Sequence, residues 1–252
     1  MRLTPACLQA ASSSVDDIKA LTGRPDRPRS IRLFENPILE FASRAHPVTP
    51  ALWFLPLLVW GAIHSLERLG LRSSAPLFLG GWVGFSLFEY LLHRFAFHGL
   101  LRATRSRRRQ VWGFLVHGYH HHFPNDSMRL VMPPLLSWPV AFLFVVGYEI
   151  CLGPERAIPA ISGTLGGYLA LFSVHYYLHH SRPAWGPGKW LRRYHLRHHH
   201  QDTDSRYGVT SPFWDVVFRT TGAGSALAGR PPAAAETGLR GVVNRLRTLG
   251  RR

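Results

Sequence analysis

The chain has 252 residues, which is enough for one domain, or at most two, with a buried core. Hydrophobic residues make up 46% of it, yet the mean hydropathy is −0.03, which indicates strongly apolar segments separated by very polar ones. The net charge of +16 comes almost wholly from arginine. A chain this basic can bind nucleic acid, anionic lipid or an acidic protein, and the distribution of the charge along the chain must decide between them. The two cysteines, Cys7 and Cys151, form no C-x-x-C pair, which argues against a disulfide framework or a thiolate iron–sulfur site.

Residues 1–47 are expected to be an N-terminal leader. The first eleven residues lack a continuous apolar stretch, so a cleaved signal peptide is not expected. Residues 12–30 are polar and rich in Pro and Arg, and are expected to be loose. Residues 31–44 (IRLFENPILEFASR) could form an interfacial helix that Pro37 interrupts.

Four apolar runs follow, at about residues 48–66, 75–92, 132–152 and 158–178. Each approaches the ~20 residues that a helix needs to cross a bilayer core. A single run of this kind could be a buried helix of a soluble protein, but four runs in two closely spaced pairs argue against that alternative. We therefore expect an all-α integral membrane domain over residues 48–221, with four transmembrane helices and a cytoplasmic helical cap.

The distribution of charge predicts the orientation. The two short loops between paired runs carry only Arg68, Arg72 and Arg156, out of 30 basic residues. By the positive-inside rule the other side is cytoplasmic, and both termini lie there. The preference for Arg over Lys suggests a GC-rich genome, so a bacterial inner membrane is favoured over the endoplasmic reticulum.

Ten of the fifteen histidines form four clusters, each just beyond an apolar run, and four spans bring all four clusters to the cytoplasmic side. Histidines three or four apart on a helix share a face, so each cluster can aim its ring nitrogens at one point. Ten ligands suit two metal ions, which the two halves of the chain would hold jointly. The predicted ligands are His93, His98, His117, His120, His121, His175, His179, His195, His198 and His199.

Imidazole ligands suit zinc, iron, copper or nickel, so the ligand set alone does not choose the metal. Nearby polar groups could orient the rings or serve as an occasional ligand, or could instead be solvated loop and cap residues. Those predicted to support the ligands are Asp126, Asp202, Asp215 and Tyr194, with Glu89, Asn125 and Asp204 as further candidates. The remaining histidines are typical of helix ends: His46, His64, His122, His180 and His200.

Other functions fit the pattern less well. A membrane b-type cytochrome needs axial histidines facing each other across the bundle, whereas these gather at and beyond the span ends. A transporter would need ionisable groups near the bilayer midplane, and the spans are nearly free of them. Residues 102–109 (RATRSRRR) are held between spans, so they are expected to contact anionic headgroups or to set topology, not to bind nucleic acid. The tail, residues 222–252, is expected to be flexible and basic, with an amphipathic helix near its end.

The histidine motifs and their surroundings resemble the integral-membrane fatty acid hydroxylase superfamily (sterol desaturase/fatty acid hydroxylase), most closely the fatty acid 2-hydroxylases. The matching text is HRFAFH (93–98), HGYHHHFPNDSMRLVMPP (117–134), HYYLHH (175–180) and YHLRHHHQDTDSRYGVTSPFWDVVF (194–218), within a similarity over about residues 79–221. The resemblance implies a four-helix bundle with a dimetal cap that uses O2 and two electrons to hydroxylate an acyl chain. Iron is expected in the active enzyme, since zinc has no redox chemistry, although isolated protein could carry zinc.

Two departures bear on partners and substrate. Eukaryotic relatives often carry a fused cytochrome b5 domain with an H-P-G-G motif, whereas this chain has only His46-Pro47-Val48-Thr49. A separate acidic donor of ferredoxin or cytochrome b5 type is therefore expected. Leu171 and Phe172 stand where close relatives carry Tyr-Asp, which leaves the lipid substrate open. The alternatives are a sterol or carotenoid hydroxylase, a desaturase, and a non-catalytic metal-binding membrane protein.

Overall fold

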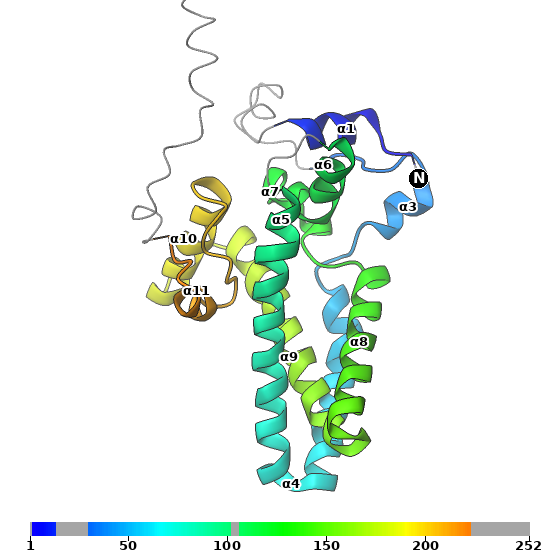
Figure 1. Ribbon diagram of the computed structural model, residues 1–252, viewed down its shortest axis with the longest axis vertical. Helices are drawn as coiled ribbons and strands as arrows, with labels where there is room; N and C mark the ends of the chain where they lie inside the picture. The colour runs from blue at the N-terminus through cyan, green and yellow to red at the C-terminus, as the bar shows by residue number, and fades with distance from the viewer. Residues whose placement is uncertain (1, 14–29, 102–105, 223–252) are drawn as a thin grey trace, which may run out of the picture.

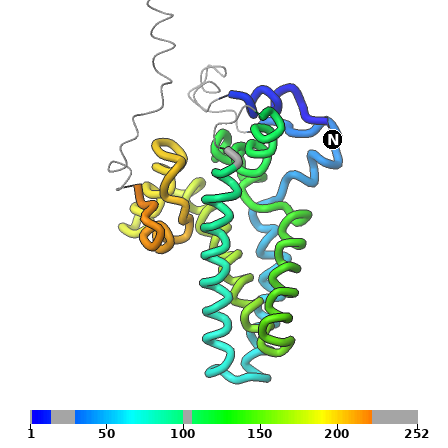
Figure 2. The backbone as a smooth tube through the Cα atoms, in the orientation of Figure 1, coloured from blue at the N-terminus to red at the C-terminus, as the bar shows by residue number. Residues whose placement is uncertain are grey.

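The computed structural model describes residues 2–13, 30–101 and 106–222, and within these ranges the protein is helical apart from one isolated bridge between Leu3 and Phe34. Helical arms from α4, α8 and α9 run side by side, and a cap of short helices covers one end of them (Figures 1 and 2). The expectation of an all-α protein is confirmed. Most of the loose part of the leader, half of the Arg-rich segment and nearly all of the tail fall outside the described residues.

Helix α4 (Thr49–Leu91) contains the first two apolar runs. A straight helix of 43 residues would be about 65 Å long, roughly twice the bilayer core. The helix reverses direction at Gly70, whose φ of 69° and ψ of 168° are readily adopted only by glycine. It therefore forms two arms, residues 49–69 and 71–91, joined by a tight turn.

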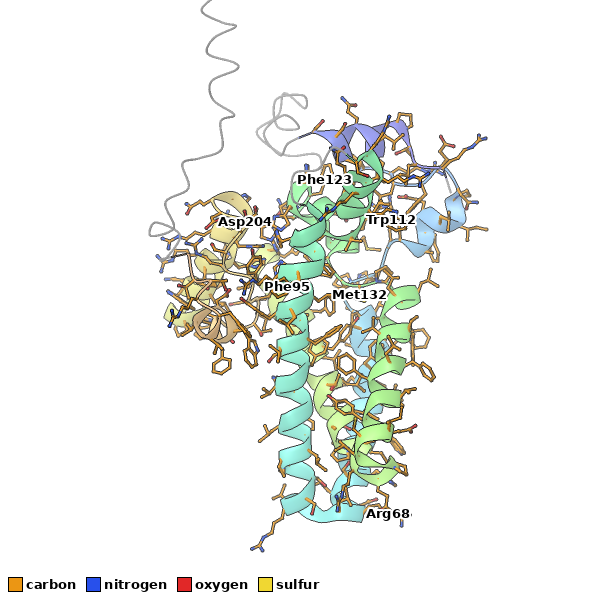
Figure 3. All side chains as sticks on the ribbon, viewed as in Figure 1. Arg68, Phe95, Trp112, Phe123, Met132 and Asp204 are labelled. Carbon is orange, nitrogen blue, oxygen red and sulfur yellow. The ribbon has the colours of Figure 1, made fainter. Side chains whose placement is uncertain are left out.

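The third and fourth arms are α8 (Pro134–Leu152) and α9 (Pro154–His180), which meet at Gly153 with φ 77°. Both reversals lie at the same end of the bundle, where Figure 3 places Arg68, and the cap lies at the other end (Figures 1 and 3). Among the described residues, three helical segments are long and apolar enough to cross a membrane: Thr49–Phe97, Ser127–Leu152 and Pro154–His180. The structure therefore joins the first two expected spans into one segment with a turn.

The second arm of α4 packs closely against α9 at two glycines. A Cβ on Gly163 would collide with the carbonyl oxygen of Phe78, and one on Gly81 with the carbonyl oxygen of Ala160. Backbone contact of this kind is possible only where a side chain is missing. Gly80, by contrast, has open space around it. A small residue is therefore required only at the positions where the two helices touch, and not at every glycine of this arm.

Short helices form the cap that carries most of the polar chemistry. In chain order they are η1 (Leu92–Phe97), α5 (His98–Leu101), α6 (Arg107–Gly113), η2 (Phe114–Gly118), α7 (Tyr119–His122), η3 (Ser127–Arg129), α10 (Gly186–His200) and α11 (Phe213–Val217). Of these, η1 and η2 are π-helices with wider turns than an α-helix.

The N-terminal segment packs onto this cap through α1 (Pro5–Ser12) and α3 (Pro37–Ala42). Cys7 in α1 is fully buried in a cluster with Phe114 and Tyr119. The expected helix over residues 31–44 is shorter than predicted, because Asn36 caps it and Pro37 begins it instead of interrupting it.

Candidate metal centre

All ten predicted ligands are buried, and their ring nitrogens converge on two points. Within each group, one ligand atom from every histidine lies within 4.8 Å of the others. Site 1 consists of His93, His98, His117, His121 and His198; site 2 consists of His120, His175, His179, His195 and His199. Each site takes four histidines from one half of the chain and one from the other, which is the arrangement expected if the two halves hold two ions jointly.

Two of the clusters have the spacing H-x2-H-H: His117, His120 and His121, and His195, His198 and His199. In each of them the middle histidine belongs to a different site from the other two. His117 and His121 are one turn apart on the cap and face site 1, whereas His120 faces site 2. Neighbouring residues on a helix point about 100° apart, so adjacent histidines cannot both face one ion. The second motif repeats the pattern, with His198 as the member that crosses to site 1. The expectation that each cluster aims at a single point is therefore wrong for these two motifs.

The H-x4-H spacing of the first cluster is explained by the π-helix η1. The backbone N–H of His98 donates to the carbonyl of His93, five residues earlier. On a regular α-helix, residues five apart diverge by about 140°. The wider turn brings both rings to site 1, where their Nε2 atoms lie 3.2 Å apart. A spacing of five between ligands was the sequence signal for this π-helix.

The outer ring nitrogens of two site 1 ligands are held by backbone carbonyls. His93 Nδ1–H donates to the carbonyl of Tyr207 at 2.6 Å, and His198 Nδ1–H donates to the carbonyl of Ser205 at 2.6 Å. These bonds fix the tautomer and direct Nε2 of each ring inwards. The sequence does not indicate that the carbonyls of Tyr207 and Ser205 are these partners, because every residue has a backbone carbonyl whatever its side chain.

Three of the four predicted supporting residues stabilise the loop that carries these carbonyls. The fully buried carboxylate of Asp215 accepts the backbone N–H groups of Tyr207 and Gly208, each at 2.9 Å, and the hydroxyl of Tyr194 at 2.9 Å. Burial, together with this carboxylate, raises the pKa of Tyr194 well above its usual value. Asp202 accepts the hydroxyl of Ser205 at 2.7 Å.

The fourth, Asp126, belongs to neither site and caps η3, where its carboxylate accepts the backbone N–H of Met128 at 3.0 Å, in agreement with the alternative of a cap residue. It accepts the hydroxyl of Tyr119 at 2.5 Å and forms an ion pair with Arg129 at 3.5 Å. Arg129 in turn binds Glu40 of α3. Asp126 therefore stabilises the junction between α7 and the N-terminal segment.

The chemistry of the two sites fits divalent cations. Desolvation, reinforced by His93, lowers the pKa of His98 to about 2, and desolvation, reinforced by His98, lowers that of His198 to about 3. The rings are therefore neutral near pH 7 and present lone pairs to one another. Nε2 of His120 and of His198 is buried with no hydrogen-bond partner among the described residues. A bound cation would satisfy these buried nitrogens.

The other five histidines lie outside both sites. The carbonyl oxygens of Gly118 and Ser13, for example, accept from the ring of His122 at 2.7 and 3.2 Å, and His180 stacks on Tyr176 with ring centroids 4.4 Å apart.

An apolar cavity of about 560 Å³ opens beside the two sites. Histidines of site 1 and site 2 line it together with Glu89, Leu136, Leu171 and Phe172. The sequence did not identify these cavity walls, because an apolar residue that faces a cavity has the same sequence pattern as one that faces lipid.

Comparisons with known proteins agree with this geometry. Residues 78–220 match the fatty acid hydroxylase family. Dihydroceramide fatty acyl 2-hydroxylase FAH1 of Arabidopsis thaliana is 34% identical over 195 residues, which cover 75% of this chain and 79% of that protein. Human fatty acid 2-hydroxylase is 30% identical over 212 residues, 76% of this chain but only 57% of the human protein.

A solved structure is similar as well. The structure of full-length scs7p, in which only the hydroxylase domain is visible, matches with a TM-score of 0.72 and 33% identity, covering 84% of this chain and 81% of that one. The family match, the sequence relatives and the similar structure all indicate a hydroxylase. The chain belongs to the fatty acid hydroxylase family.

Proposed function

We propose that this chain is a membrane-bound diiron oxygenase that hydroxylates the 2-position of a fatty acid or acyl lipid. In the overall reaction, O2, two electrons and two protons convert a C–H bond into C–OH and release water. The proposal is supported by the names of the relatives, which include a dihydroceramide fatty acyl 2-hydroxylase, a ceramide very long chain fatty acid hydroxylase and a fatty acid 2-hydroxylase.

The observation that carries the proposal is that a single apolar cavity is lined by histidines of both sites. An alkyl C–H bond is too inert for acid or base catalysis, so the reaction needs redox chemistry. Two bound iron ions would supply it, held by the five histidines of each site; zinc would not. The protein's own contribution is to exclude water from the cavity and to hold the acyl chain with its carboxyl end beside the histidines.

The same proposal requires a separate electron donor. On α10, the buried face carries three ligand histidines, while Lys189, Arg193 and Arg197 are exposed at intervals of one turn. These cations suit an acidic donor of ferredoxin or cytochrome b5 type. We further propose that all four arms cross the bilayer with the histidine end in the cytoplasm, as the charge distribution predicts.

Lipid mass spectrometry of cells expressing the chain tests the activity. Wild type is expected to add one oxygen atom to acyl chains, at the carbon next to the carboxyl. The double variant His120→Ala/His121→Ala, which removes one ligand from each site, should abolish the product, whereas the exposed His46→Ala should not.

Other results would identify the alternatives. Loss of two hydrogen atoms would indicate a desaturase, and an oxygenated sterol or carotenoid would indicate those substrates. Unchanged lipids with two ions still bound to wild type would indicate a metal-binding protein without catalysis.

A further inference from the structure

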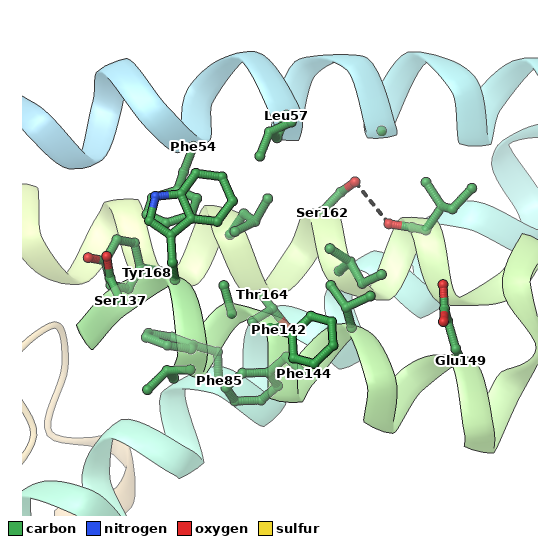
Figure 4. A pocket seen from close by; sticks show the side chains of 18 of the residues that line it. Phe54, Leu57, Phe85, Ser137, Phe142, Phe144, Glu149, Ser162, Thr164 and Tyr168 are labelled. Atoms are coloured by element: carbon green, nitrogen blue, oxygen red, sulfur yellow. Dashed lines mark hydrogen bonds between the residues drawn. The ribbon is translucent and has the colours of Figure 1, made fainter. Parts of the chain in front are cut away.

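A second cavity of about 450 Å³ lies deeper in the bundle, on the side away from the metal centre. Figure 4 shows it between the first arm of α4, α8 and α9, with Tyr168 and Ser137 at one end and Glu149 at the other. Phe85, Val140 and Tyr168 line both this lower cavity and the upper cavity beside the histidines. The two cavities therefore meet at these side chains.

Helix α9 gives the scale of the arrangement. From His175 in the upper cavity to the shared Tyr168 is seven residues, or about 10 Å of helix. From Tyr168 to Ile158 at the far end of the lower cavity is a further ten residues, or about 15 Å. The two cavities together extend along most of the bundle.

The boundary consists of aromatic rings. Phe85 and Tyr168 meet edge to face with their centroids 6.0 Å apart, and Tyr168 also contacts Phe54 at 5.2 Å. The Phe85 ring is held by van der Waals packing, and rotation of its side chain changes the opening between the two rings.

Apart from Ser137, Tyr168 and Glu149 at its two ends, the lower cavity presents mainly hydrocarbon to its contents. Of its hydroxyl groups, Ser162 donates to the carbonyl of Ile158 at 2.9 Å, and Thr164 donates to the carbonyl of Gly81 at 3.2 Å. The hydrogen-bonding capacity of both is therefore used within the bundle. An apolar space of this size is costly to leave empty, so an apolar occupant is expected.

We infer that the lower cavity holds the methyl end of the substrate's acyl chain, and that Phe85 and Tyr168 control its entry and so set the preferred chain length. A bilayer core about 30 Å thick is two acyl chains deep, so one ordinary membrane chain extends about 15 Å. The boundary at Phe85 and Tyr168 lies about 10 Å from His175, so an ordinary chain whose carboxyl end lies beside His175 would extend past this boundary. A medium-length chain, such as a decanoyl chain, would end in the upper cavity. This inference rests on the proposed function, because it takes the acyl substrate as the occupant.

Photolabelling tests the inference without depending on turnover. Stearic acid with a diazirine at its terminal carbon is expected to label lower-cavity residues such as Leu165, and unlabelled stearic acid should compete. Decanoic acid with the same terminal group should label upper-cavity residues such as Leu136. If the stearic acid probe labels only the upper cavity or the lipid-facing Leu143, the inference is overturned.

A matched pair of variants on α8 adds a functional readout. Ala141→Phe places a ring in the lower cavity, whereas Leu143→Phe alters a side chain that is 69% exposed. Ala141→Phe should lower kcat/KM for stearoyl substrate roughly tenfold or more, while decanoyl turnover and the two-ion content stay near wild type. Equal losses on both chain lengths, or none, would contradict the inference. If wild type hydroxylates neither chain but the stearic acid probe still labels Leu165 competitively, the proposed reaction fails and the binding inference stands.

Discussion

Replacing Asp215 with Asn should release one of the two metal ions. The Asp215 carboxylate accepts four hydrogen bonds: Oδ1 from Tyr207 N–H and the Thr220 hydroxyl, and Oδ2 from Gly208 N–H and the Tyr194 hydroxyl. Asn turns one of these oxygens into a donor. A hydroxyl can rotate away, but a buried backbone N–H cannot, so at least one donor loses its acceptor.

The magnitude follows from these contacts. An unsatisfied buried N–H costs about 1–3 kcal/mol, and the lost bonds to a charged acceptor add to that, so about 3 kcal/mol of stability is at stake. For a chain of this size, each kcal/mol lowers Tm by about 2–4 °C. The disturbed loop holds His93 and His198, and both belong to site 1. Affinity at site 1 should therefore fall by about 10- to 100-fold, as is typical when support for a ligand is lost.

The assay combines melting of the purified protein in detergent with metal content after dialysis against a weak chelator. Asp215→Asn should melt about 6–12 °C lower and retain about one ion per chain. The exposed Asp204→Asn, on the same loop, should behave as wild type. An Asp215→Asn protein with both ions and an unchanged Tm would refute the argument that this loop orients the site 1 ligands.

Three further predictions concern the crossed ligands, the helix contact and the topology. His120→Ala and His121→Ala should each cost one ion, and the double variant both; a double variant that still holds one ion tightly would show that these neighbours serve the same site. Gly163→Ala should lower stability by about 1–3 kcal/mol in a denaturation assay, because its methyl group would collide with the facing helix, whereas Gly80→Ala should have no such cost; equal effects would contradict the close contact. The exposed Cys151, near the turn between α8 and α9, should react with a membrane-impermeant maleimide added outside intact cells, and labelling only after lysis would contradict the proposed orientation.

The sequence predicted the parts of the site that depend on residue type and local spacing. The ten histidines could be chosen because they are clustered and follow apolar runs, and the runs themselves indicated four helical arms with every cluster at one end. The sequence could not predict which histidines belong to site 1 and which to site 2. This division depends on the direction of each ring, and a π-turn such as that at His93 changes this direction by more than the spacing alone suggests.

What the sequence determined by itself is therefore which histidines make up the candidate metal centre and at which end of the bundle they gather, because both follow from short-range patterns. The tertiary structure decided how His120 and His198 cross between sites, which carbonyls hold the rings, and where the cavities lie. These features arise from contacts between segments far apart in the chain. A backbone carbonyl or a cavity wall has no residue type of its own, so only the packed arrangement reveals it.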